Sequence, residues 1–170
     1  MTRQQLTHEQ TKIDRKTFPV TIVCDDIIIS ENVGAMFRVA EALGAEQLIL
    51  MGQTSVPPNR KIRKASRSTD RFVPFEYAEN KVEAIEKLKD KGYRLVGVEI
   101  TNDSIPLTNY KIPANQPIAL VMGAEKYGIS DEVLPLLDEC VIIEMFGQNS
   151  SMNVVSALSI ALYEVTRQLK

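Results

Sequence analysis

The sequence predicts an α/β domain, with a mostly parallel β-sheet and helices on both faces. Short apolar runs rich in β-branched residues alternate along the chain with segments of helical periodicity. These runs lack the polar–apolar alternation of a strand with one wet face, so we expect strands buried on both sides. Such alternation of strands and helices is typical of a parallel sheet covered by helices.

The expected strands are the six short apolar runs, and each is too short for an apolar helix. They lie at residues 20–24, 47–51, 72–76, 94–100, 117–122 and 140–143.

Four segments are expected to be helical. In the first, apolar residues recur at spacings of three and four after the helix-start residues 30–32, and Gly44 closes the helix. Val82, Ile85 and Leu88 share one face of a second helix that ends near Gly92. A short helix at residues 131–137 and an apolar helix at residues 154–170 complete the set.

The 170 residues suit a single domain with its own core, which we expect to span residues 1–170. Residues 1–17 are polar with sparse apolar positions such as Leu6 and Ile13, and predict an N-terminal arm or short helix. Cys24 and Cys140 are far apart, and the sequence has no signal-like start and no apolar run near ~20 residues. We therefore expect reduced thiols in a cytoplasmic protein that does not bind membranes.

The charge balance excludes a broadly basic nucleic-acid-binding protein. The chain carries 20 basic and 22 acidic side chains, for a net charge of −2. Any contact with nucleic acid must therefore be local. His8, the only histidine, lies in the polar N-terminal stretch, which disfavours a histidine base or a His/Cys metal site. We expect no metal, and chemistry that uses Arg, Lys, Asp, Glu or the substrate itself.

Three polar or glycine-bearing loops follow predicted strands, at residues 30–34, 123–128 and 144–153. In a parallel sheet, ligands bind at the carboxyl ends of the strands. The last loop holds four or five possible cap residues where a helix start needs one, which suggests a ligand; a well-capped buried helix explains it equally well. None of the loops carries the usual dinucleotide or P-loop pattern.

The other two loops are each open to two interpretations. Gly34 and Arg38 share a helix face, and the glycine leaves room for a ligand. A helix-start glycine and a solvated arginine are the alternative. Residues 123–128 leave a strand through Gly123, offer Glu125 and turn at Gly128, so backbone amides there can hold a nucleobase edge or a carboxylate. A plain strand-to-helix loop is the alternative.

Residues 59–71 form the one concentrated basic stretch. Six cations stand against one acid, interleaved with small hydroxyl residues, which favours RNA or another polyanion over a merely solvated face. The stretch contains no aromatic residue, so its contacts should position a nucleic acid more than read it. The six cations are Arg60, Lys61, Arg63, Lys64, Arg67 and Arg71.

Three short motifs together resemble those of a known family. They are Asn-x-Gly-x-x-x-Arg at 32–38, Gly-x-Glu-x-x-Gly at 123–128 and Ser-x-Asn at 151–153. In order and spacing they are similar to the motifs of the SpoU/TrmH family of the SPOUT superfamily, which are S-adenosylmethionine-dependent RNA methyltransferases. Residues 97–101 and 163–168 also look like this family, so the resemblance covers about residues 18–170.

The resemblance implies a deep trefoil knot at the C-terminus, which sequence reasoning would not choose because knots are almost absent among folds. It implies S-adenosyl-L-methionine in a pocket lined by Gly123, Ile143 and Met152, with Thr101 near the sugar or the methionine portion. It also implies a homodimer with the active site at the subunit junction. The apolar final helix, with its serines and alanines, agrees with such an interface.

The activity implied by the resemblance is methylation of a ribose 2′-hydroxyl in structured RNA, with tRNA expected first and rRNA second; DNA is not expected. Arg38 is then the central catalytic residue. A pKa above ~12 makes a general-base role demanding, so we expect Arg38 to bind the adjacent phosphate and stabilise the developing alkoxide. The supporting side chains, which orient Arg38 and close the pocket, are Asn32, Glu125, Ser151 and Asn153.

Two residues depart from the family pattern. Glu144 stands where a proline is usual, which removes a rigid turn, and Met152 replaces a leucine. Two other functions compete with the leading one. The first is a non-catalytic RNA-binding protein on the same fold. The second is an ordinary flavodoxin-like or nucleotide-binding domain, which would be an unknotted monomer.

Overall fold

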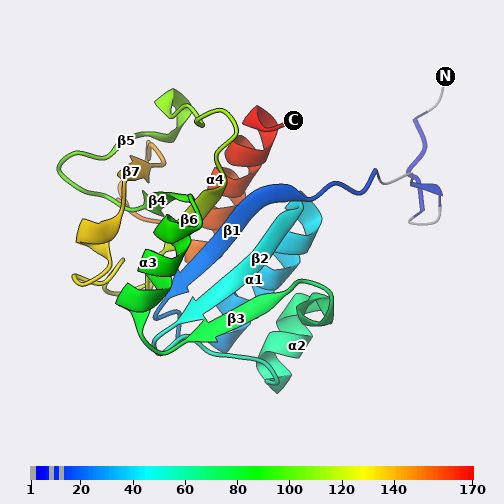
Figure 1. Ribbon diagram of the computed structural model, residues 1–170. Helices are drawn as coiled ribbons and strands as arrows, with labels where there is room; N and C mark the ends of the chain where they lie inside the picture. The colour runs from blue at the N-terminus through cyan, green and yellow to red at the C-terminus, as the bar shows by residue number, and fades with distance from the viewer. Residues whose placement is uncertain (1–2, 8–9, 12–13) are drawn as a thin grey trace.

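A computed structural model of the chain describes residues 3–7, 10–11 and 14–170. Its centre is a sheet with the strand order β3-β2-β1-β6-β4-β7-β5 (Figure 1). Each strand pair assigned in this sheet is parallel. The strands are β1 (Phe18–Asp25), β2 (Ala45–Met51), β3 (Phe75–Ala78), β4 (Arg94–Val98), β5 (Ile105–Pro106), β6 (Ile118–Met122) and β7 (Glu139–Ile142). The α/β class with a parallel sheet is confirmed.

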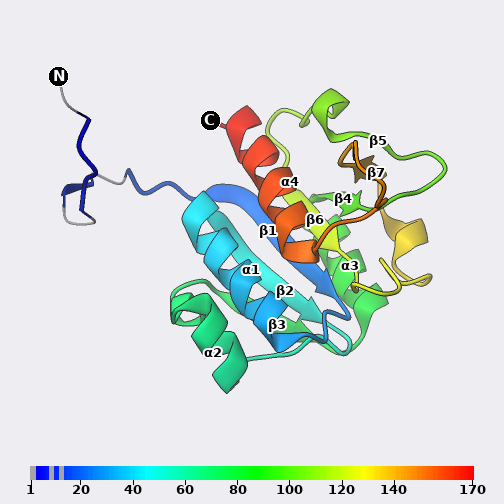
Figure 2. The same ribbon diagram turned by 180° about the vertical axis from the view of Figure 1, so that it is seen from behind.

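Three of the four α-helices in the described residues cover the two faces of this sheet, and the remaining one packs on a helix. The four helices are α1 (Ser30–Leu43), α2 (Arg60–Ser66), α3 (Lys81–Asp90) and α4 (Val154–Gln168). Helices α1 and α4 lie side by side against one face, as Figure 2 shows, and α2 packs on α1. Helix α3 covers the other face. Because helices cover both faces, the central strand β6 is buried along its whole length, as its unbroken apolar sequence predicts.

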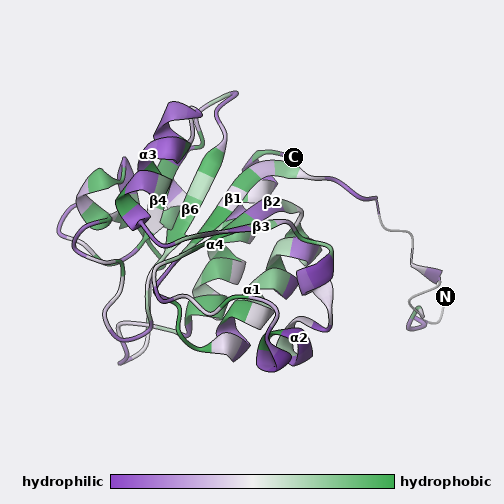
Figure 3. Ribbon diagram, turned by 60° about the horizontal axis from the view of Figure 1, so that its bottom comes forward, coloured by the Kyte–Doolittle hydropathy of each residue, from purple (hydrophilic) through white to green (hydrophobic). Residues whose placement is uncertain are grey.

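Hydropathy follows this layering. In Figure 3, β6 and α4 are largely hydrophobic, whereas α2 and α3 show hydrophilic outer surfaces. Among the described residues, no helix combines the length and the apolar content that crossing a membrane requires. The deep knot fits this fold and stays a prediction.

Two expected elements differ in the structure. Residues 131–137 form turns and a 3₁₀ helix at Leu134–Leu136 instead of an α-helix. Pro135 has no N–H with which to continue an α-helical ladder. The third strand begins at Phe75 instead of Phe72, because the amides of Phe72 and Val73 both donate to Thr69 O in a preceding turn.

Among the α-helices and strands of the described residues, two were not expected. The basic stretch contains α2, whose N-terminus is capped by the Asn59 side chain accepting from the amides of Lys61 and Ile62. The other is the two-residue strand β5. Ahead of β1, the described residues are exposed and lead away from the sheet (Figure 1). His8 and Ile13 lie outside the described residues.

Candidate active site

A cavity of about 360 Å³ opens at the carboxyl ends of β4, β6 and β7. The segments that follow these strands form its walls, and the first turn of α4 contributes Val154 and Ala157. Its volume falls in the range of ~300–1,000 Å³ typical of small-molecule sites. The cavity therefore lies where a parallel sheet is expected to bind its ligand.

Of the residues predicted for the cofactor, Gly123, Ile143 and Met152 line this cavity, and so do Glu125 and Ser151. Thr101 does not. Its hydroxyl donates to Asp103 Oδ1 at 2.7 Å, and its amide donates to Ser104 Oγ at 3.2 Å, in a turn of their own.

The wall formed by residues 123–128 is a closed loop. Ala124 N donates to Gly128 O at 3.0 Å, and Gly128 N donates to Ala124 O at 2.8 Å. A Cβ at Gly123 would overlap the backbone of Gly128 and Ile129, and Gly128 has a φ of +69°. Both positions therefore need glycine because of the loop's own geometry.

The three sequence motifs meet beside the cavity. Asn32, near the start of α1, donates from Nδ2 to Glu125 Oε1. Asn153 donates from its own Nδ2 to Asn32 Oδ1 at 3.4 Å, and its Oδ1 accepts from Val155 N at 2.9 Å as the cap of α4. The structure thus joins Asn32, Glu125 and Asn153 in one chain of side-chain contacts.

Arg38 lies on the exposed side of α1 and is not among the cavity-lining residues. In the described part of the chain, its guanidinium has no hydrogen-bond or ion-pair partner. Of the two interpretations left open for Gly34, the one that leaves room for a ligand is wrong. A Cβ there would overlap Ile62 and Ala65 of α2, so this glycine instead allows α1 and α2 to pack closely.

The basic stretch divides into paired and unpaired cations. Arg63 Nε lies 3.2 Å from Oδ2 of the buried Asp70, and Lys61 Nζ lies 3.3 Å from Glu31 Oε1. Burial raises the pKa of Asp70, but hydrogen bonds from Ser66 and Arg63 outweigh it and leave that pKa below its ordinary value. The cations without an ion-pair partner among the described residues are Arg60, Lys64, Arg67 and Arg71, all exposed.

Sequence reasoning missed Glu99 as a residue of this site. Its carboxylate lines the cavity and accepts hydrogen bonds from Ile100 N at 2.9 Å and Ile129 N at 3.0 Å. The available signal was the resemblance of residues 97–101 to the family, which did not single out Glu99 because the predicted strand at 94–100 included it. In the described part of the chain, no group of three or more His, Cys, Asp or Glu residues is arranged to hold a metal ion.

The fold is that of the SPOUT methyltransferases, with a small-molecule cavity and three convergent motifs at the carboxyl edge of a parallel α/β sheet. The model of the SpoU rRNA Methylase family matches residues 19–163. The chain therefore belongs to the SpoU family of RNA methyltransferases, and the resemblance expected from the motifs is confirmed.

Curated relatives agree with this assignment. A Staphylococcus haemolyticus protein assigned to the TrmH family of tRNA/rRNA methyltransferases is 31% identical over 160 residues, which are 94% of this chain and 63% of that protein. The 23S rRNA (guanosine-2′-O-)-methyltransferase RlmB of Ralstonia nicotianae is 33% identical over 150 residues, or 88% of this chain and 59% of its own length. The chain thus spans about three fifths of these relatives.

Solved structures share the fold. An AdoMet-bound rRNA methyltransferase from Sinorhizobium meliloti aligns with a TM-score of 0.84 at 25% identity, over 93% of this chain and 59% of that one. A structure described as giving insights into the 2-OH methylation of C/U34 on tRNA aligns with a TM-score of 0.78 at 25% identity. That alignment covers 89% of this chain and 98% of the other.

Proposed function

We propose that this protein transfers the methyl group of S-adenosyl-L-methionine to a ribose 2′-hydroxyl of tRNA. The observation that carries the proposal is the chain of contacts from Glu125 through Asn32 to Asn153 at the edge of the cavity. It brings the three family motifs to one place. Two relatives named for 2′-O or 2-OH methylation support the ribose as acceptor. The structure described for methylation on tRNA is matched over 98% of its length, and this favours tRNA over rRNA as the substrate.

The cavity fits the proposed cofactor. It exposes backbone at Gly123 and apolar side chains at Ile143 and Met152, which suit an adenine ring. Glu99 and Glu125 also line the cavity, and their negative charges complement the positive charge of a sulfonium. The cofactor supplies a methyl group that is already activated, so the chain's own residues need only align the acceptor, stabilise its alkoxide and accept a proton.

Arg38 has the properties needed to stabilise that alkoxide. A guanidinium with no internal partner among the described residues keeps its donors free for a phosphate and for the developing negative charge. The proton of the 2′-hydroxyl then leaves through the phosphate or a water. Asn32, held by Glu125 and Asn153, and Ser151 on the adjacent loop orient the acceptor and close the pocket.

A homodimer would explain why Arg38 does not line the cavity of its own chain. On α4, Ile160 and Tyr163 are 42% and 60% exposed and lie beside Leu43 and Leu107, at an apolar hollow of about 480 Å³. A second copy of α4 covers this face and brings Arg38 of one protomer to the cavity of the other. We accordingly propose a cytoplasmic homodimer.

The exposed cations of the basic stretch provide the surface for RNA. Because α2 lies on α1, which carries Arg38, the phosphate contacts and the catalytic arginine are on connected elements. Contacts by Arg60, Lys64, Arg67 and Arg71 would fix the position of the RNA without reading its sequence.

The experiment combines labelled S-adenosylmethionine with tRNA that lacks its own 2′-O-methyl groups and measures incorporation. Arg38→Ala should abolish transfer while leaving cofactor affinity, measured by calorimetry, nearly unchanged. Lys87→Ala is the control, since Lys87 is paired with Glu83 on α3, which covers the other face of the sheet. Loss of transfer and cofactor binding together in Arg38→Ala would indicate a structural role instead. A wild-type protein that binds RNA but no cofactor would be a non-catalytic RNA-binding protein.

A further inference from the structure

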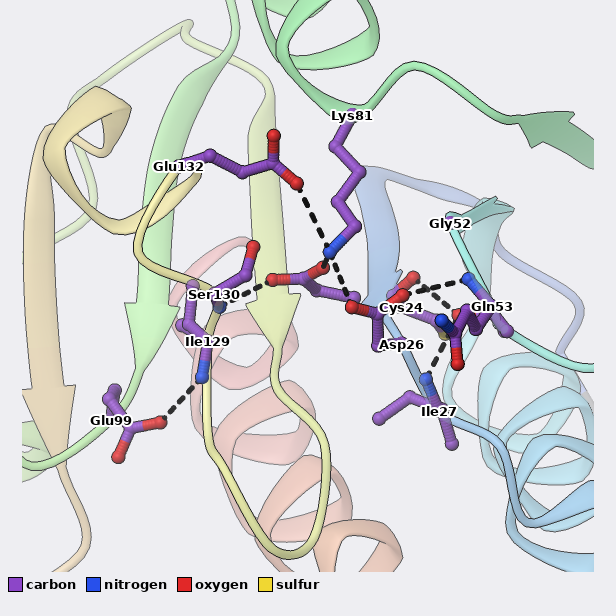
Figure 4. Close-up of polar contacts among 12 residues, drawn as sticks. Cys24, Asp26, Ile27, Gly52, Gln53, Lys81, Glu99, Ile129, Ser130 and Glu132 are labelled. Atoms are coloured by element: carbon purple, nitrogen blue, oxygen red, sulfur yellow. Dashed lines mark hydrogen bonds and ion pairs between the residues drawn. The ribbon is translucent and has the colours of Figure 1, made fainter.

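A partly buried ion-pair cluster lies at the carboxyl end of β1, outside the cavity (Figure 4). Lys81, the first residue of α3, places its ammonium 3.0 Å from Asp25 Oδ1 and 3.4 Å from Glu132 Oε1, and also bonds Asp26 Oδ2. The side chain of Asp25 is fully buried and that of Lys81 is 10% exposed. We call these four residues the Lys81 cluster.

The cluster holds the loop that forms the cavity wall. The second oxygen of Asp25, Oδ2, accepts a hydrogen bond from Ser130 N at 2.7 Å. The Ser130 hydroxyl is buried and has no hydrogen-bond partner within the described residues. Its backbone amide therefore provides the attachment at this point.

A second carboxylate holds the preceding residue. Ile129 N donates to Glu99 Oε2 at 3.0 Å. In the sheet, β6 lies between β1 and β4. Asp25 ends β1, and Glu99 directly follows β4. Carboxylates from the strands on both sides of β6 therefore hold the chain that follows the 123–128 loop. Figure 4 shows the contact between Glu99 and Ile129 and the position of Ser130.

The backbone of residues 128–130 connects the held amide of Ser130 to the cavity wall. Residues 129 and 130 directly follow Gly128, whose backbone is packed against Gly123 so closely that no Cβ fits between them. Gly123 lines the cavity, whereas the side chains of Asp25 and Lys81 do not reach it. A shift of Ser130 would therefore displace the wall formed by Gly123 and Gly128.

Lys81 supplies the positive charge that compensates the carboxylates of this cluster. Burial lowers the pKa of Lys81, but hydrogen bonds to Asp26 and Asp25 outweigh it and raise that pKa above its ordinary value. Removing the ammonium would leave three carboxylates together, one of them fully buried, without a compensating charge. An ionised carboxylate also accepts a stronger hydrogen bond from Ser130 N than a neutral one does.

We propose that Asp25 and Lys81 are positioning residues for the cofactor, which hold Ser130 and thereby the 123–130 loop in the position that forms the cavity wall. The identity of the cofactor rests on the proposed function; the attachment of the loop does not. The roles are distinct from those of the residues that line the cavity, since neither side chain meets the ligand.

The test compares Asp25→Asn, Lys81→Met and Lys81→Arg with the wild type. The control is Lys87→Met, which removes an exposed ion pair to Glu83 from the same helix. Hydrogen exchange of the ligand-free chain is followed at Gly128, Ile129 and Ser130 and, for reference, in β2. Calorimetry gives the affinity for S-adenosylmethionine, and thermal unfolding gives stability.

For Asp25→Asn and Lys81→Met we expect exchange at the three loop amides to become about tenfold faster, cofactor binding to weaken about tenfold, and exchange in β2 to stay unchanged. Lys81→Arg should retain part of the loop's protection from exchange and part of the cofactor affinity. Lys87→Met should change neither the loop exchange nor the affinity. Lower stability with unchanged loop exchange and unchanged affinity would overturn the proposal. If Lys81→Met does not fold, the isosteric Asp25→Asn decides the question by the same two measurements.

Failure of this proposal can be distinguished from failure of the proposed function. If the wild type binds no S-adenosylmethionine, the cofactor assignment is wrong, while exchange of the ligand-free chain still decides whether the cluster holds the loop. If the wild type binds the cofactor and both variants bind it equally well, the positioning role is wrong and the cofactor assignment stands.

Discussion

Asn153 Nδ2 lies 3.4 Å from Asn32 Oδ1, and this contact joins two residues that are 121 positions apart in the sequence. The oxygen of the same Asn153 amide, Oδ1, accepts a hydrogen bond from Val155 N and so caps α4. One side chain therefore both begins the last helix and ties it to the first.

The double role of Asn153 predicts different outcomes for two substitutions. Asn153→Asp keeps an acceptor for Val155 N, but removes the donor to Asn32 and adds a negative charge near Glu125. We expect stability close to wild type and a loss of methyl transfer of tenfold or more, on the order of 1.4 kcal/mol. Asn153→Ala should in addition lose about 1 kcal/mol of stability with the helix cap. Denaturant unfolding measures the stability, and transfer assays measure the activity. Equal losses of stability in Asn153→Asp and Asn153→Ala would contradict the separate capping and positioning roles of Asn153.

Gly123→Ala should abolish cofactor binding. The added methyl would overlap the backbone of Gly128 and Ile129, so the wall of the cavity must move. Gly147→Ala, in the loop before α4, is the matched control, because a Cβ there meets nothing within 4 Å. Calorimetric titration with S-adenosylmethionine should show no binding to the first variant and near-wild-type binding to the second. Equal affinity in both variants would show that the loop is not a binding wall.

The unpaired cations of α2 should determine the salt dependence of RNA binding. The double variant Arg60→Ala/Lys64→Ala should reduce the slope of log affinity against log salt by roughly 0.7–0.9 for each RNA phosphate that the protein no longer neutralises. Lys89→Ala/Lys91→Ala, at the end of α3 on the other face of the sheet, removes the same charge and should leave the slope unchanged. Filter binding across a salt series measures both slopes, and equal reductions would point to net charge instead of a site.

Glu164 should contribute to stability at neutral pH and lose that contribution in acid. Hydrogen bonds from Arg167 and Gln168 lower the pKa of Glu164 from 4.5 to about 2. Between these values the unfolded chain binds more protons than the folded one, so stability falls as the pH decreases from 4.5 toward 2. Compared with the wild type, Glu164→Gln should flatten this part of the stability curve. Chemical unfolding at several pH values provides the comparison; parallel curves would contradict the assignment.

Local sequence patterns were sufficient where one segment determines its own structure. The three- and four-residue spacing and Gly44 predict α1, which ends at Leu43. Apolar periodicity did not predict α2, because that helix is short and buries only Ile62 and Ser66. At residues 131–137 the apolar content predicts an α-helix, but Pro135 lacks the N–H that an α-helix requires.

The candidate site was predictable as three motifs but not as a set of contacts. Nothing in the sequence pairs Asn32 with Asn153, since their proximity depends on the packing of α4 against α1. The Lys81 cluster and its contact with Ser130 could not be predicted for the same reason. Asp25 ends β1, Lys81 begins α3 and Ser130 lies in the loop after β6, and these segments meet only in the folded sheet, where β1 and β6 are neighbours. Residue type alone suggests that Gly34 leaves room for a ligand, whereas the structure fills that room with α2.

The measurement that tests the central claim most directly is the chemical identity of the methylated nucleotide. Unmodified tRNA is incubated with the protein and methyl-labelled S-adenosylmethionine and then hydrolysed with alkali, which cannot cleave the chain after a 2′-O-methylated ribose. We predict that the label appears in alkali-resistant dinucleotides and that Arg38→Ala produces none. Label recovered in mononucleotides carrying a methylated base would contradict the account.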